Sequence, residues 1–331
     1  MNQRYRPITH LGLGGTGLGD MYHTTSDEAA RATVDAAWEA GIRYFDTAPH
    51  YGAGLSEHRL GQALRRRPRA DYTLSTKVGR LLRPAPVGEI ASPFVSALPF
   101  RRVIDYTSDG ARRAVEDSLQ RLAVGHIDIV YVHDLSPDQF SRAEFEHYFT
   151  IAAGRNGAFE GLLRLREEGV IKAWGMGVNT VEPCLRALRE SDPDIFLLAG
   201  RYTLMETTPL DQLFPLCLAR GAGVVLGGPF NSGFLAGGEH YDYLPAGPAK
   251  HAQRERLRQV AARHGVDLAA AALQFGAAHP VVAATIPGAS SPQHLRRNAT
   301  LMSIGVPAAF WQDLLAEGLL PPDAPLPAAS D

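Results

Sequence analysis

The chain has 331 residues, 45% of them hydrophobic, so it can bury a large core as two modest domains or as one barrel-sized domain. Its formal net charge of −2 shows no excess of positive charge of the kind that binds nucleic acid or an anionic membrane. Two cysteines, at no metal-ligand spacing, argue against a disulfide framework and fit the reducing cytoplasm. We therefore expect a cytoplasmic protein that binds neither nucleic acid nor membranes.

A glycine cluster at residues 12–19 contains the spacing G-x-G-x-x-G, with Asp35 downstream. A dinucleotide-binding fingerprint of this kind needs its glycines to lead directly into a helix. Here residues 20–25 intervene, and the helical pattern starts only near Ser26. The pattern favours a strand and a tight glycine loop over a Rossmann unit, although such a loop still lets a cofactor approach the backbone closely.

Strand and helix patterns alternate through most of the remaining chain. The expected strands are residues 11–14, 42–46, 72–77, 127–133, 171–178, 194–199, 224–227 and 282–286. The expected helices are residues 26–41, 56–67, 108–122, 158–168, 181–190, 210–220, 250–264, 268–279 and 292–303. Eight such units predict an α/β fold, a closed parallel (β/α)₈ TIM barrel in one domain, residues 1–320, with a Pro/Ala-rich tail at residues 321–331.

The most apolar stretch, residues 268–287, approaches membrane-spanning length but is interrupted by Gln274, Gly276, His279 and Pro280. We interpret it as a helix, a break and a barrel strand. The polar residues 1–7 lack the apolar core of a signal peptide.

Two connections, residues 79–107 and 229–249, are longer than the few residues usual between strand and helix. Both follow strands, which places them at the C-terminal face of a barrel, where chemistry is displayed. They contain aromatic residues and can wall a substrate pocket there; the alternative is that they are flexible surface loops.

Four polar residues follow apolar strands at this face: Asp46 and Tyr51 after the second strand, Lys77 at the end of the third and His133 at the end of the fourth. Each alone has a structural explanation, as a turn cap, a solvated strand end or a satisfied core histidine. Together they suit proton transfer, because an ammonium beside a phenol favours the phenolate and a carboxylate keeps that ammonium charged. An imidazole can orient a substrate carbonyl or hydroxyl.

Four segments in order then resemble the aldo-keto reductase superfamily over nearly the whole chain. They are Phe45-Asp46-Thr47-Ala48-x-x-Tyr51-Gly52, Ser75-Thr76-Lys77-Val78, Asp128 to His133 and Ile286-Pro287-Gly288. Further segments, such as residues 227–233 and 199–202, look most like the family's bacterial aldose 1-dehydrogenase (L-fucose and D-threo-aldose) and pyridoxal 4-dehydrogenase branch.

The resemblance implies a catalytic tetrad of Asp46, Tyr51, Lys77 and His133. Tyr51 is then the general acid in reduction and, as the phenolate, the base in alcohol oxidation. Lys77 tunes the pKa of Tyr51, Asp46 holds Lys77, and His133 orients the substrate oxygen. In this family the nicotinamide lies across the barrel mouth without a Rossmann domain.

The resemblance also implies the cofactor-binding positions, although several depart from the commoner pattern. Gly177 and Val178 replace a serine-asparagine pair, which leaves Asn179 for the carboxamide; Ala199 replaces a glutamine; and Gly227 replaces a stacking aromatic residue, for which Phe230 can substitute. The positions carried over are Gly15, Thr16, Asp46, Asn179, Pro229, Phe230, Gly233, Ile286, Gly288, Ser290, His294, Arg297 and Asn298.

The cofactor is expected to be NAD, with NADP as the alternative. The lysine and arginine that grip a ribose 2′-phosphate in phosphate-dependent members correspond here to Gly288 and His294, and a dianion needs paired cationic donors. Arg296 and Arg297 leave NADP open, because either can swing round to a phosphate.

We therefore expect an NAD(P)-dependent oxidoreductase acting on a sugar hemiacetal or another small polar alcohol or aldehyde, with an aldose 1-dehydrogenase that forms a lactone as the leading hypothesis. The alternatives are a pyridoxal 4-dehydrogenase, an NADPH-dependent carbonyl reductase and a regulatory barrel that binds cofactor without turnover. No histidines recur at ligand spacing, so we expect no metal. The sequence does not indicate an oligomeric state.

Overall fold

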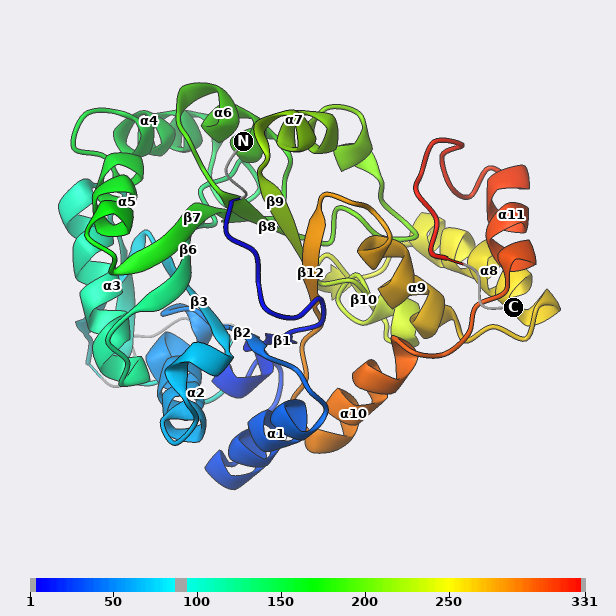
Figure 1. Ribbon diagram of the computed structural model, residues 1–331, viewed down its shortest axis with the longest axis horizontal. Helices are drawn as coiled ribbons and strands as arrows, with labels where there is room; N and C mark the ends of the chain where they lie inside the picture. Colours follow the sequence, from blue (N-terminus) through cyan, green and yellow to red (C-terminus); the bar gives the residue numbers. More distant parts are fainter. Residues whose placement is uncertain (1–3, 87–93, 329–331) are drawn as a thin grey trace.

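The structure is a computed structural model that describes residues 4–86 and 94–328. Eight parallel strands form one sheet, and bridges from Leu11 to Thr285 and from Gly14 to Gly288 close its ends into a barrel (Figure 1). The predicted TIM barrel is confirmed. In sheet order the strands are β1 (Leu13–Gly14), β2 (Tyr44–Asp46), β3 (Thr73–Val78), β6 (Ile127–His133), β7 (Ile171–Val178), β8 (Ile195–Ala199), β9 (Gly223–Gly227) and β12 (Val282–Ile286).

The helices surround this barrel (Figure 1), and their predicted bounds agree with the structure to within about three residues. Several begin at a side-chain cap, such as Ser26 and Thr107, whose hydroxyls accept backbone N–H groups of the first turn. The helices are α1 (Asp27–Glu39), α2 (Leu55–Leu64), α3 (Ser108–Leu122), α4 (Arg142–Ala153), α5 (Ala158–Glu167), α6 (Glu182–Glu190), α7 (Leu213–Arg220), α8 (Pro248–Arg263), α9 (Leu268–Ala277), α10 (Pro292–Leu301) and α11 (Ala308–Ala316). Helices α4 and α11 were not predicted.

The N-terminal segment crosses one end of the barrel (Figure 1). The hydroxyl of Tyr5 lies 3.2 Å from Thr73 Oγ1, at the start of β3, and its ring packs on the apolar cluster inside the barrel. This end is therefore covered, which leaves the C-terminal ends of the strands for the connecting loops.

The two long connections contain strands that the sequence pattern did not predict. Residues 79–107 include the antiparallel pair β4 (Arg80–Pro84) and β5 (Phe100–Ile104), and residues 229–249 include the short pair β10 (His240–Tyr241) and β11 (Leu244–Pro245). Residues 87–93 of the first connection lie outside the described residues.

The predicted tail is packed where it is described. Ala324 is buried, and Leu326 packs against the main core. Residues 329–331 lie outside the described residues. Among the described helices, none is long and apolar enough to cross a membrane.

Candidate active site

The strand register directs the four predicted catalytic residues to one end of the barrel. Asp46 pairs with Ser75, and Lys77 pairs with Tyr131. Because side chains alternate along a strand and paired residues share a face, Asp46, Lys77 and His133 all point inward. The three lie at or near the C-terminal ends of β2, β3 and β6, three neighbouring strands.

Lys77 and Asp46 form an ion pair that is almost completely buried. Lys77 Nζ lies 2.7 Å from Asp46 Oδ2 and donates a second hydrogen bond of 2.8 Å to the carbonyl of Thr47. Their side chains are 1% and 3% exposed. Removing two charges from water is costly unless both are paired and hydrogen-bonded, and this pair meets that condition.

A chain of hydroxyl groups supports the ion pair from inside the barrel. Ser75 Oγ donates to Asp46 Oδ1 at 2.6 Å, and the hydroxyl of Tyr44 lies 3.1 Å from both Ser75 Oγ and the hydroxyl of Tyr131. All are fully buried. Sequence reasoning gave these three residues no role, although two of them occur in the segments that carry the family resemblance.

Tyr51 and His133 lie beside this pair. The Tyr51 ring centroid is 4.6 Å from Lys77 Nζ and 5.8 Å from the His133 ring. Phe94, from the first long connection, packs against Tyr51 and His50 at ring-centroid distances of 6.0 and 5.3 Å. The structure therefore brings all four predicted residues together and packs an aromatic side chain against Tyr51.

The site keeps its histidines neutral. Burial lowers the pKa of His133 well below its ordinary value, and the charges of Lys77 and Arg80 lower it further. Burial, with Arg80 next in importance, lowers the pKa of His50 to about 2. A neutral imidazole retains one N–H donor and one acceptor, which suits it to orienting an oxygen atom.

Tyr51 differs from the sequence expectation. Burial raises its pKa well above the ordinary value, and the carboxylates of Asp46 and Asp134 raise it further, whereas Arg80 lowers it. The lysine was expected to favour the phenolate. In the structure its charge is offset by Asp46 only 2.7 Å away, so loss of solvent decides the direction.

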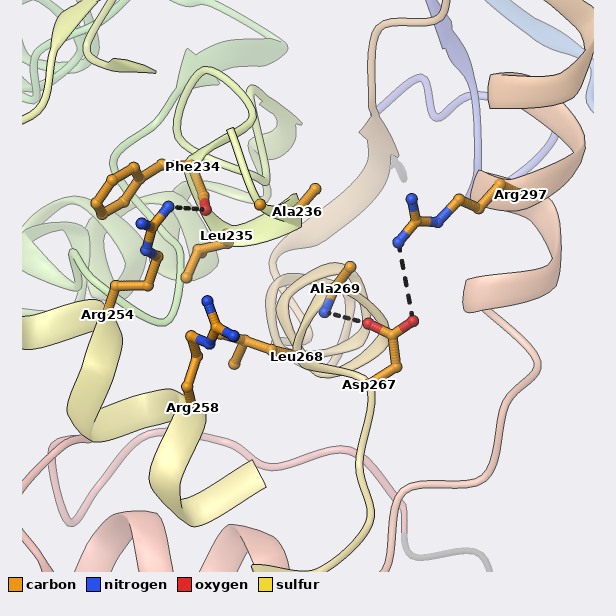
Figure 2. Close-up of a pocket in the computed structure, with 10 residues that line it drawn as sticks. Phe234, Leu235, Ala236, Arg254, Arg258, Asp267, Leu268, Ala269 and Arg297 are labelled. Atoms are coloured by element: carbon orange, nitrogen blue, oxygen red, sulfur yellow. Dashed lines mark hydrogen bonds and ion pairs between the residues drawn. The ribbon is translucent and has the colours of Figure 1, made fainter. Parts of the chain in front are cut away.

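A pocket of about 190 Å³ lies outside this cluster, between the segment after β9 and helices α8, α9 and α10 (Figure 2). Its charged lining consists of Arg254 and Arg258 from α8, Arg297 from α10 and Asp267 at the start of α9. Asp267 accepts the backbone N–H of Ala269 at 2.8 Å and lies 3.9 Å from Arg297. The pocket thus offers three guanidinium groups and one carboxylate.

Comparison with known proteins agrees with this geometry. Residues 10–315 match the Aldo/keto reductase family. The chain belongs to that family. It is 41% identical to pyridoxal 4-dehydrogenase of Microbacterium luteolum and 38% identical to D-threo-aldose 1-dehydrogenase of a Pseudomonas species, each match covering 95% of both chains. A solved aldo-keto reductase of Bacillus halodurans, in its holo form, matches 100% of this chain and 98% of its own, with 25% identity and a TM-score of 0.72.

This aldo-keto reductase is therefore an NAD(P)-dependent oxidoreductase. The expected cofactor residues near β1 and β12 meet one another: Gly288 is bridged to Gly14, and a Cβ added at Gly288 would lie 3.5 Å from Thr16 Oγ1. Gly15 packs so closely on β2 that an added Cβ would lie 2.5 Å from the carbonyl of Asp46. Ile286 is buried at the end of β12.

The expected residues on α10 and after β9 extend toward the pocket of Figure 2. Ser290 and His294 lie about the start of α10, with Ser290 Oγ 3.5 Å from His294 Nδ1. Asn298 donates to the carbonyl of Gly288 at 3.4 Å, and Arg297 lines the pocket (Figure 2). Gly233 precedes residues 234–237, which line the same pocket, and Pro229 is buried before it.

Two expected contacts are occupied by protein groups. The amide of Asn179 donates to Asp138 Oδ2 at 3.2 Å, and Phe230 packs on residues of α9 and α10. In contrast, Thr180 Oγ1 and Asn231 Oδ1 are buried and have no hydrogen-bond partner among the described residues. They follow β7 and β9, so this rim contains polar groups without a hydrogen-bond partner among the described residues. Such groups fit a nicotinamide dinucleotide, which is rich in hydrogen-bond donors and acceptors.

Proposed function

We propose that this aldo-keto reductase is an NAD-dependent aldose 1-dehydrogenase, which oxidises a sugar hemiacetal to a lactone in the cytoplasm. The observation that carries the proposal is the buried Lys77–Asp46 pair beside Tyr51, with a neutral His133 across the phenol ring. The relatives support the oxidative direction, because both are named dehydrogenases and one of them is named for aldoses.

In this mechanism the chain moves a proton and orients an oxygen. The N–H of His133 donates to the substrate hydroxyl oxygen, and the phenolate of Tyr51 accepts the hydroxyl proton as the carbon–oxygen double bond forms. Lys77 holds a positive charge near the phenolate, and Asp46 fixes that lysine. The bound nicotinamide supplies the hydride acceptor. We propose that, when bound, it would be held by the expected residues from Gly15 to Asn298 and that Arg297, which lines the pocket of Figure 2, would bind its adenosine end.

The test is a screen of purified protein with NAD and with NADP against L-fucose, other aldoses, pyridoxal and simple alcohols, read as absorbance of the reduced cofactor. We expect aldoses with NAD to give the largest kcat/KM. Pyridoxal is the second candidate, since Phe94 presents an aromatic surface at the site and the pyridoxal 4-dehydrogenase is 41% identical. Turnover of aldehydes with NADPH alone would contradict the proposal.

The pH dependence should differ between the two directions. Because the pKa of Tyr51 is raised, the phenolate is the minor form at neutral pH, and its fraction rises about tenfold for each pH unit below that pKa. The kcat for oxidation should therefore rise with pH, whereas reduction, which needs the protonated phenol, should stay level over the same range. Since the pKa of His133 is lowered, imidazole protonation should add no acid limb near pH 6. Steady-state pH profiles in both directions measure this.

Two substitutions should shift the cofactor preference from NADH toward NADPH. Gly288 is exposed, the nearest atom to an added Cβ is 3.5 Å away, and His294 is exposed on α10, so larger side chains fit at both positions. Gly288→Lys with His294→Arg should tighten NADPH binding at least about tenfold relative to NADH, because paired cations grip the 2′-phosphate. Fluorescence titration of both cofactors measures the ratio, with Gly288→Gln/His294→Gln as the uncharged control. Equal affinity of the unmodified protein for both cofactors would refute NAD preference.

A further inference from the structure

A second ion pair lies at the active site. Arg80, the first residue of β4, places Nη2 2.9 Å from Oδ2 of Asp134, and both side chains are largely buried. The same guanidinium places Nη1 3.2 Å from Nδ1 of His50. The β4–β5 hairpin is thereby fastened to the rim, and Asp134, the residue after His133, receives a fixed partner.

The backbone also fixes Asp134. Its φ is +51°, a left-handed conformation that most side chains avoid and that Asp, Asn and Gly adopt most readily. Its N–H donates to the carbonyl of Gly177 at 2.9 Å. This backbone conformation occurs where the chain leaves β6, and the carboxylate of Asp134 lies close to the imidazole of His133.

The carboxylate of Asp134 lies close to the imidazole that orients the substrate oxygen in the proposed mechanism. Asp134 Oδ2 lies 3.5 Å from His133 Nε2. In a vicinal diol the two hydroxyl oxygens are separated by about 2.8 Å, which is comparable with the 3.5 Å between His133 Nε2 and Asp134 Oδ2. A substrate whose reacting oxygen accepts from His133 therefore brings the neighbouring hydroxyl to Asp134.

We propose that Asp134, held by Arg80, determines specificity by accepting a hydrogen bond from the hydroxyl on the carbon next to the reacting carbon. The inference rests on the proposed function for its substrate, the aldose, whose C2 hydroxyl is the one bound. The ligand class is a vicinal diol or α-hydroxy carbonyl compound. A charged acceptor at this position favours such substrates over simple alcohols, because hydrogen bonds to charged groups are the strong ones.

The test compares L-fucose with 2-deoxy-L-fucose, which differ in that hydroxyl alone. For the unmodified protein, kcat/KM should be at least about tenfold higher for L-fucose. Asp134→Gly removes the acceptor and should bring the ratio near one, whereas Asp134→Asn keeps a neutral acceptor and should give an intermediate ratio. Both replacements tolerate the left-handed backbone, so circular dichroism should show the native spectrum for each, with a lower melting temperature for Asp134→Gly because Arg80 loses its partner.

The control is Asp35→Asn, which removes one carboxylate from an ion pair between α1 and the segment that follows α2 and should leave the ratio unchanged. A ratio near one in the unmodified protein, or a ratio unaltered in Asp134→Gly, would overturn the inference. If neither sugar is oxidised, the proposed function fails. The inference is then decided by comparing kcat/KM for the reduction of glycolaldehyde with that for acetaldehyde. The same tenfold preference and the same loss in Asp134→Gly are then expected, and their absence refutes the role of Asp134.

Discussion

Tyr51→Phe should lower kcat for both oxidation and reduction by about 10²- to 10⁴-fold, the range that a positioned general acid or base contributes. The phenylalanine ring retains the packing of Tyr51 on Phe94 and His133 and its place beside Lys77. The variant loses the hydroxyl and little else. Binding of NADH, measured by fluorescence titration, should therefore stay within about threefold of the unmodified protein.

A matched control separates this loss from the general effect of removing a buried hydroxyl. Tyr202 is fully buried, and its hydroxyl has no hydrogen-bond partner among the described residues. Tyr202→Phe should therefore leave kcat nearly unchanged. Turnover by Tyr51→Phe at the rate of the unmodified protein, with NADH still bound, would remove Tyr51 from the mechanism and leave His133 as the remaining candidate for proton transfer.

Much of the site could be predicted from the sequence, because a barrel places the C-terminal ends of its strands at one face. Once residues 42–46, 72–77 and 127–133 were recognised as parallel neighbours, their terminal side chains had to meet. What the pattern could not show is how deeply each side chain lies. The raised pKa of Tyr51 follows from burial and from the short Lys77–Asp46 distance, and both depend on packing that no motif specifies.

The residues that sequence reasoning missed act through three-dimensional contacts. Arg80 and Asp134 are separated by two strands and a helix, and their pairing depends on a hairpin whose strands carry no short-turn signal. Helix α4 is a different case, because the sequence does contain a signal for its start. Ser141 and Glu144 form a capping box, a spacing that marks a helix start in sequence.

The largest effect on stability should come from Lys77→Met. Methionine approaches the length of lysine but leaves Asp46 charged, 2% exposed and without its cation. Breaking a buried pair by removing one partner typically costs about 3–5 kcal/mol, because the desolvated charge remains. Urea unfolding followed by circular dichroism should show that loss. The exposed pair of Arg112 and Glu168 provides the control, since Arg112→Met should barely move the midpoint.

The double variant Asp46→Asn/Lys77→Met distinguishes an uncompensated charge from lost packing. It removes both charges, so it should be more stable than Lys77→Met alone, and a less stable double variant would contradict the charge argument.

Lowering the pH should also reduce the cost of the unpaired Asp46 charge in Lys77→Met. Burial already raises the pKa of Asp46 with Lys77 present, so without the lysine the folded state should bind a proton more readily than the unfolded chain. Stability then rises as pH falls through the folded-state pKa, so the deficit of Lys77→Met should narrow as the pH falls from neutral toward the ordinary range of a carboxyl group, whereas that of the double variant should not.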